Sequence, residues 1–191
     1  MDRRSMIIVF TGNGKGKTTA SLGQMVRVLG RGKSALMIQF IKGPWRSGED
    51  EFAERFEEFF RESRGPESHR RTDFVIKKMG LGFVGILGDK LPREEHERAA
   101  AKALEYFREE VASGKWHLII LDEINVAVSL GLIAVETVIE AIKNYPKERI
   151  LILSGRNAPP EFIEVANLAT EMREIKHPFN DGELAKYGVE F

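Results

Sequence analysis

The sequence predicts an α/β fold in which a mostly parallel β-sheet is covered by helices on both faces. Short, uniformly apolar runs alternate along the chain with longer amphipathic stretches. Strands that are buried on both faces of a parallel sheet carry such runs, and consecutive parallel strands need a crossover that is usually a helix. The expected strands are residues 6–10, 35–40, 74–76, 118–121, 150–153 and 172–175, and the expected helices are residues 17–30, 49–62, 92–113, 135–145 and 160–168.

The elements of the first half each have a local signal. Residues 6–10 are a continuous apolar run, and a glycine-rich turn follows them. The helix after that turn has one apolar face with i, i+3, i+4, i+7 spacing, formed by Leu22, Met25, Val26 and Leu29. The charged helix of residues 49–62 carries four phenylalanines on one side: Phe52, Phe56, Phe59 and Phe60. Residues 79–88 contain four glycines and are expected to form a loop.

The second half shows clear helix boundaries. Pro92 suits the first position of a long helix, and acidic residues follow it in the first turns, as a helix N-terminus favours. The buried face of this helix is expected to be Ala100, Leu104, Phe107 and Val111. Pro146 stops the next helix after Tyr145 because proline cannot donate a helical hydrogen bond.

Composition limits the classes of function. The 191 residues suit one domain, 1–191. Lys plus Arg equals Asp plus Glu, 29 each, so no net charge attracts nucleic acid or an anionic membrane. The chain has no cysteine, which excludes disulfides, thiolate zinc sites and a cysteine nucleophile. Because no apolar run approaches the roughly 20 residues of a membrane span, and residues 6–10 are too short for a signal peptide, we expect a cytoplasmic protein.

The strongest motif lies between the first strand and the first helix. Its glycines let successive backbone N–H groups converge on an anion, and the helix N-terminus adds partial positive charge. Lys17 is expected to reach the terminal phosphates of ATP, and the Thr18 hydroxyl to ligate Mg²⁺ or Mn²⁺. The predicted nucleotide-binding residues are Gly12, Asn13, Gly14, Lys15, Gly16, Lys17, Thr18 and Thr19. The chain is therefore expected to be a P-loop protein with a Walker A motif and a RecA-like fold.

The motif departs from the common pattern at one position. Thr11 stands where the first glycine is usual, and glycine follows one residue later at Gly12. The dinucleotide pattern G-x-G-x-x-G is not met, because its third glycine would fall on Lys17. A glycine-rich turn with an incidental lysine is the simpler interpretation, but the flanking strand and helix favour a phosphate loop.

A second acidic signal closes the strand of residues 118–121. Asp122 and Glu123 follow it directly. In P-loop folds an acid at the carboxyl end of a neighbouring strand binds Mg²⁺, directly or through water. Thr18, Glu123 and Asp122 are therefore the predicted metal residues, and an ordinary solvated strand end is the alternative. If the strand continued, the two acids would point to opposite faces, so one of them should dominate.

Several sequence blocks together resemble one family, the P-loop ATP:corrinoid adenosyltransferases. The resemblance runs almost end to end, from Ile7 to Phe191, and the Gly-Asn-Gly-Lys-Gly-Lys-Thr-Thr block is more specific than a generic P-loop. The blocks that carry it are residues 10–20, 39–43, 79–83, 121–124 and 154–159 and the tail 165–191.

The resemblance implies transfer of the 5′-deoxyadenosyl group of ATP to the cobalt(I) of a reduced corrinoid, with release of triphosphate, in adenosylcobalamin biosynthesis or salvage. It implies catalytic roles for Lys17, Thr18 and Glu123, a contact between Phe83 and the corrinoid, and a place for Arg156 in the nucleotide site. It further implies Mg²⁺ or Mn²⁺, a flavoprotein that reduces cobalt(II), and a homodimer. No nucleic-acid or membrane partner is expected.

The chain departs from this family at identifiable positions. Gly85 stands where members often carry a tryptophan that helps to exclude the lower axial ligand of the corrinoid, and Asn180 stands where an aspartate is usual. The N-terminal extension that covers the corrinoid in some members is expected to be nearly missing, because the first strand starts by residue 6.

Two other functions fit the motifs. A P-loop small-molecule kinase would need a general base near the γ-phosphate and an arginine-bearing lid, a role in which Arg156 could serve. A non-catalytic ATP-dependent switch or an assembly ATPase would need a partner surface that no sequence feature demands. The products separate these functions: triphosphate, ADP with a phosphorylated acceptor, or ADP with phosphate.

Overall fold

The computed structural model describes residues 5–63, 73–86, 88–184, 186 and 188–189. Within them six strands form one sheet in the order β3-β2-β4-β5-β1-β6, and all neighbouring strands are parallel. The strands are β1 (Met6–Thr11), β2 (Ala35–Gln39), β3 (Phe74–Lys78), β4 (Leu118–Asp122), β5 (Ile150–Ser154) and β6 (Leu168–Glu171).

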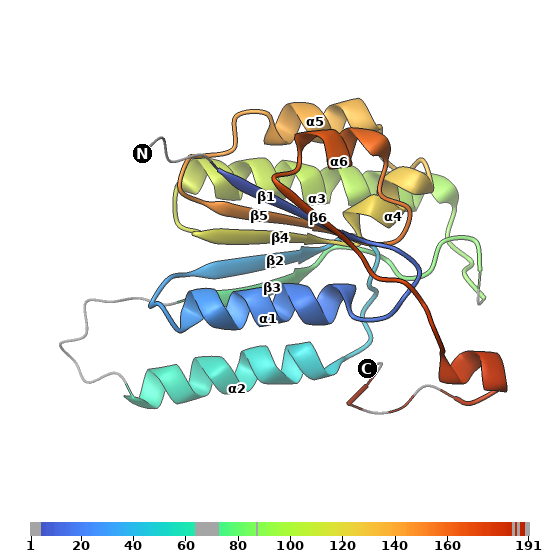
Figure 1. Ribbon diagram of the computed structural model, residues 1–191, viewed down its shortest axis with the longest axis horizontal. Helices are drawn as coiled ribbons and strands as arrows, with labels where there is room; N and C mark the ends of the chain where they lie inside the picture. Colours follow the sequence, from blue (N-terminus) through green and yellow to red (C-terminus); the bar gives the residue numbers. More distant parts are fainter. Residues whose placement is uncertain (1–4, 64–72, 87, 185, 187, 190–191) are drawn as a thin grey trace.

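Helices lie on both faces of this sheet (Figure 1). One face carries α1 (Lys17–Leu29) and α2 (Gly48–Ser63). The other carries α3 (Arg93–Ser113), α4 (Ile124–Ser129), α5 (Val135–Ile142) and α6 (Pro160–Val165), and a 3₁₀ turn, η1 (Pro178–Asp181), lies in the C-terminal segment. The predicted α/β fold with a parallel sheet between two layers of helices is confirmed.

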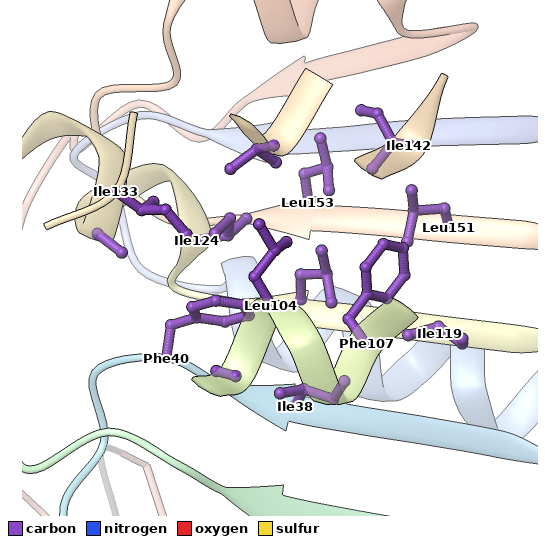
Figure 2. Close-up of a cluster of buried hydrophobic side chains, with 14 of the residues drawn as sticks. Ile38, Phe40, Leu104, Phe107, Ile119, Ile124, Ile133, Ile142, Leu151 and Leu153 are labelled. Carbon is purple, nitrogen blue, oxygen red and sulfur yellow. The ribbon is translucent and has the colours of Figure 1, made fainter. Parts of the chain in front are cut away.

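Alternate residues of the strands supply two separate hydrophobic cores. In β2, Leu36 and Ile38 face α3, whereas Ala35 and Met37 belong to the core beneath α1. Figure 2 shows the α3 side, where the fully buried Phe107 packs with neighbouring aliphatic side chains of the strands. Removing such a ring costs about 3–5 kcal/mol, so these two cores hold the strand ends rigidly in place.

The strand order favours a ligand-binding crevice at the carboxyl ends of the strands. The chain passes from β1 over β5 and β4 to β2, so connections leave β1 and β4 in opposite directions along the sheet. In open parallel sheets ligands bind at the carboxyl ends of the strands near such a reversal. The register sets Gln39 opposite Asp122 and Phe10 opposite Ser154. The polar residues Gln39, Asp122 and Ser154 therefore lie together at the carboxyl ends of their strands.

The last strand does not lie where the sequence pattern placed it. The expected strand at residues 172–175 is wrong, because the pairing segment is β6, Leu168–Glu171, and α6 ends at Val165 rather than at residue 168. Asn167 explains both changes: its side-chain Oδ1 accepts a hydrogen bond from the Ile7 N–H at 2.7 Å, and its own N–H donates to the Ile7 carbonyl. This side chain ends the helix and begins pairing with β1.

Two further observations concern helices. The short helix α4 follows directly on β4, where no helix was expected. In α2, Phe52 and Phe56 pack against Phe74, with ring centroids 6.1 Å from it, while the side chains of Phe59 and Phe60 lie outside the described part of the structure.

In the described residues no helix is both long and apolar enough to cross a membrane.

Candidate active site

The glycine-rich loop is closed against the backbone that follows β6. The N–H of Gly14 donates to the carbonyl of Met172 at 2.6 Å, and the N–H of Met172 donates to the carbonyl of Thr11 at 2.8 Å. A Cβ atom at Gly12 would lie 2.5 Å from the Met172 oxygen, and one at Gly14 would lie 2.7 Å from the Arg173 carbonyl carbon. Glycine is therefore required at both positions by close backbone contact.

Lys17 occupies the inside of this loop. Its ammonium donates to the carbonyl oxygens of Gly12 at 2.8 Å and Gly14 at 2.7 Å, and the side chain is buried. Burial lowers the pKa of Lys17. Since α1 begins at Lys17, the ammonium and the N-terminus of a 13-residue helix point to the same place, an arrangement suited to a phosphate.

Asp122 accepts hydrogen bonds from several elements of the site. It is fully buried at the end of β4. Its Oδ1 accepts hydrogen bonds from the hydroxyls of Thr18 at 3.1 Å and Ser154 at 2.7 Å, and its Oδ2 accepts one from the Gln39 amide at 3.2 Å. The first turn of α1 and three neighbouring strands thus converge on one carboxylate.

Glu123 takes a different direction from Asp122. Its φ of 62° is left-handed, which ends β4 and turns the chain into α4. The strand therefore does not continue through the two acids. Burial, together with the charge of Asp122, raises the pKa of Glu123 to about 7. Its carboxylate lies near Gly155, where a Cβ atom would be 3.0 Å from Glu123 Oε2.

A lysine and a glutamate from the segment that follows β2 complete the charged cluster. Lys42 follows β2 and donates to Glu49 in the first turn of α2. Burial alone would lower the pKa of Lys42, but Asp122 and Glu49 outweigh it and raise the pKa. The pKa of Glu49 is lowered, since the hydrogen bond and charge of Lys42 outweigh the effect of burial. The pair is therefore ionised at neutral pH.

Two cavities meet at this cluster. The first, which we call the phosphate cavity, has a volume of about 380 Å³ and is lined by Lys15, Gly16, Lys17, Thr18, Thr19, Leu22, Lys42, Gly48, Glu49, Glu123, Arg156, Gly188 and Val189. The second, which we call the aromatic cavity, has a volume of about 470 Å³ and is lined by Ile41, Lys42, Gly43, Trp45, Arg46, Ser47, Gly82, Phe83, Glu123, Val126 and Arg156. Lys42, Glu123 and Arg156 line both cavities.

Two aromatic side chains form the outer part of the second cavity. The rings of Trp45 and Phe83 have centroids 6.0 Å apart, and the side chains are 62% and 49% exposed. The Trp45 ring rests on the backbone of Gly43 and Gly82, where a Cβ atom on either residue would come within 2.8 Å of the ring. The Trp45 carbonyl accepts a hydrogen bond from Lys78. The Trp45 ring is thus held in place although it faces solvent.

The structure brings most of the predicted site residues together. Residues 15–19, Glu123 and Arg156 line the phosphate cavity, and Phe83 lines the aromatic cavity. Asn13 instead lines a separate polar hollow of about 450 Å³ beside β6, which Arg156 also borders. Gly12 and Gly14 shape the loop through its backbone contacts.

The motifs predict no role for several residues that the structure adds to the site: Gln39, Lys42, Trp45, Glu49 and Ser154. Gln39 lies near the end of the second expected strand, residues 35–40, and Lys42 follows that strand. Because the carboxyl ends of parallel strands lie together, their position at or just after the end of a strand was the available signal.

Known proteins match this chain over nearly its whole length. The family model for the ATP:corrinoid adenosyltransferase BtuR/CobO/CobP matches residues 3–191. A corrinoid adenosyltransferase of Sinorhizobium sp is 37% identical over 191 residues, which cover 100% of this chain and 82% of the relative. Those of Escherichia coli K12 and Salmonella typhimurium LT2 are 32% and 31% identical over 190 residues, covering 100% of this chain and 87% of each relative. The chain belongs to the ATP:corrinoid adenosyltransferase family.

Proposed function

We propose that the protein transfers the 5′-deoxyadenosyl group of ATP to the cobalt(I) of a reduced corrinoid and releases triphosphate. The observation that carries this function is the junction of the two cavities at Lys42, Glu123 and Arg156. A lysine-lined cavity suits the triphosphate, and an aromatic cavity suits a flat, largely apolar macrocycle. Their junction is where the ribose 5′-carbon and the cobalt would meet.

The phosphate cavity supports stabilisation of the leaving group. In this reaction the bond between the 5′-carbon and the triphosphate oxygen breaks, so negative charge grows on that oxygen. The Lys17 ammonium and the N-terminus of α1 are already aimed into the loop, and Lys42 and Arg156 border the same space. Preorganised positive groups of this kind stabilise a developing anion without a reorganisation cost.

The residues present fit a Mg²⁺ or Mn²⁺ ion. The Thr18 hydroxyl and Asp122 Oδ1 are hard oxygen ligands 3.1 Å apart, and the Glu123 carboxylate borders the same cavity. Mg²⁺ in nucleotide sites takes one or two protein oxygens and completes its shell with phosphates and water. We assign Thr18 and Glu123 to the metal, with Asp122 as a ligand or as the acceptor that orients Thr18. When bound, the ion would neutralise charge on the triphosphate.

The aromatic cavity supports alignment of the second substrate. The cobalt(I) of the corrinoid is itself the nucleophile, so the protein needs neither a nucleophilic side chain nor a general base. Phe83 and Trp45 would contact the corrinoid and hold its cobalt in line with the 5′-carbon. Excluding water from this junction is the remaining contribution of the protein, as is usual when a cofactor-like substrate carries the chemistry.

Further parts of the proposal concern the setting of the enzyme. The single sheet and the family match over residues 3–191 support one domain, 1–191. The reaction needs an electron donor for cobalt(II), for which we propose a flavoprotein. We also propose a homodimer in the cytoplasm, with a role in biosynthesis or salvage of adenosylcobalamin.

The test is an anaerobic assay with chemically reduced cob(I)alamin, ATP and Mg²⁺, following the corrinoid spectrum and the phosphate products. We expect a light-sensitive adenosylcorrinoid and triphosphate in equal amounts, both lost in Lys17→Ala. Lys102→Ala, an exposed change on α3, is the matched control. Formation of ADP with a phosphorylated acceptor would establish a kinase instead, and ADP with phosphate would establish an ATPase.

A further inference from the structure

The loop that carries Phe83 is closed by one carboxylate. Asp89 Oδ2 accepts a hydrogen bond from the Gly85 N–H at 2.9 Å, and Oδ1 accepts one from the Leu91 N–H at 3.0 Å. The N–H of Asp89 donates back to the Ile86 carbonyl at 3.1 Å. The hydrogen bonds from the Gly85 and Leu91 amides lower the pKa of Asp89, so the group is a carboxylate at neutral pH.

The same carboxylate connects this loop to a rigid helix. Nε2 of His96, in the first turns of α3, lies 3.0 Å from Asp89 Oδ2. The side chains of His96 and Asp89 are only 2% and 8% exposed, so the contact is shielded from water. One turn further along α3, Ala100 is buried against the sheet, and Leu104 and Phe107 extend this face. The loop is thereby tied to the hydrophobic core.

Gly85 has the backbone conformation that this closure requires. Its φ is 69°, a left-handed value that glycine adopts without strain and a bulky side chain does not. A Cβ atom there would meet nothing within 4 Å, so the backbone conformation rather than lack of space favours glycine. Glycine at position 85 therefore suits the turn whose backbone N–H donates to Asp89.

Phe83 depends on this loop for its position. Its ring is 49% exposed, so burial in the core contributes little to holding it. The fixed points nearest to it in the chain are Gly82, whose N–H donates to the Ile41 carbonyl at 2.9 Å, and Gly85, held by Asp89. Phe83 lies between these two anchors and faces the aromatic cavity.

We propose that Asp89 and His96 are positioning residues that hold the Phe83 loop in the conformation needed to receive the flat second substrate. The identity of that substrate rests on the proposed function, whereas the fixing of the loop does not. The pair acts through the Gly85 amide and through α3, and neither residue lines the cavity.

The first experiment uses the ligand-free protein, so that it is independent of the reaction. Hydrogen exchange is followed by mass spectrometry in peptides covering residues 79–86, with β3 as the internal reference. In Asp89→Ala and His96→Leu we expect exchange in the loop to become about tenfold faster. Once the Asp89 contacts are lost, local opening of the loop costs less free energy. His96→Gln, which keeps a donor, should stay close to wild type. The control Glu105→Gln breaks an exposed ion pair with Arg108 on the same helix and should change nothing.

The second experiment measures steady-state kinetics of the same variants with cob(I)alamin and ATP. Misplacement of Phe83 should raise the corrinoid KM about tenfold in Asp89→Ala and His96→Leu, with the ATP KM unchanged. Unchanged loop exchange in Asp89→Ala would overturn the proposal, and so would an equal rise in both KM values. If the wild type forms no adenosylcorrinoid, the proposed function fails, while the exchange experiment still decides the role of the pair.

Discussion

The hydroxyl of Thr18 donates to Oδ1 of Asp122 across 3.1 Å, and this bond joins two signatures that lie 104 residues apart in the chain. It connects the first turn of α1 to the end of β4, beneath the phosphate cavity. Ser154 donates to the same oxygen at 2.7 Å, so the carboxylate is held from the β5 side as well. The hydroxyl is therefore fixed in orientation before any nucleotide binds.

Removing that hydroxyl should weaken the binding of the divalent metal. Thr18→Val keeps the shape of the side chain but loses the oxygen, and we expect the Mg²⁺ concentration for half-maximal activity to rise by roughly 10–100-fold. Thr18→Ser keeps the oxygen and should remain near wild type. Mg²⁺ titrations at saturating ATP measure the effect. An unchanged Mg²⁺ requirement in Thr18→Val would remove Thr18 from the metal site.

Glu123 should make the metal-free protein less stable as the pH rises. Its pKa is raised from 4.5 to about 7 in the folded state, so between these values the folded protein binds more protons than the unfolded chain. Stability then falls as pH increases through this window and levels off above it, by roughly 3 kcal/mol in all. Glu123→Gln cannot ionise and should lack this loss.

The measurement is urea unfolding of both proteins in the presence of a metal chelator, at intervals from pH 5 to pH 8. The advantage of Glu123→Gln over wild type should grow with pH up to about 7 and then stay constant. Glu105→Gln, at an exposed position on α3, is the control and should show no such trend. A constant difference between Glu123→Gln and wild type at all pH values would contradict the prediction.

Trp45 should report corrinoid binding directly. The chain has two tryptophans. Trp116 is buried just before β4, at the amino ends of the strands, whereas Trp45 follows β2, at their carboxyl ends. Cob(II)alamin, which absorbs where tryptophan emits, should quench the emission of wild type strongly and that of Trp45→Phe weakly. Trp45→Ala should raise the corrinoid KM about tenfold, the upper range of an aromatic contact, with Trp45→Phe in between. Equal quenching in wild type and Trp45→Phe would place the corrinoid elsewhere.

Those parts of the fold that are buried could be predicted from the sequence. The strands β1, β2, β4 and β5 are nearly all apolar because helices cover both their faces, and such runs are distinct from their surroundings. The edge strand β6 has no such signal, since all its residues are exposed and its pairing depends on Asn167. Its position was therefore wrong by four residues.

The candidate site, like the fold, could be predicted from the sequence only in part. The loop of residues 11–19 could be recognised because glycine spacing and lysine position are determined by local backbone geometry. The contacts of the Asp122 carboxylate could be predicted only in part. Those with Gln39 and Ser154 depend on which strands are neighbours in the sheet. Trp45 could not be found from periodicity, because an exposed ring held over Gly43 and Gly82 leaves no pattern along the chain.

The contact between the phosphate loop and the segment after β6 should make Gly14 intolerant of a single added methyl group. In Gly14→Ala the new Cβ atom would lie 2.7 Å from the carbonyl carbon of Arg173, which is backbone and cannot rotate away. We expect a loss of about 1–3 kcal/mol of stability from this overlap, together with weaker ATP binding, because the hydrogen bond from Gly14 to Met172 must also lengthen.

Gly23 provides the matched control for this change. It lies exposed in the interior of α1, and a Cβ atom there would meet nothing within 4 Å. Gly23→Ala should therefore stabilise the protein by roughly 1 kcal/mol, the difference in helix propensity, and leave ATP binding unchanged. Urea unfolding and ATP titration of both variants make the comparison. If Gly14→Ala were as stable as Gly23→Ala and bound ATP equally well, the loop would not depend on its contact with the chain after β6, and the glycine would have to be explained by the nucleotide alone.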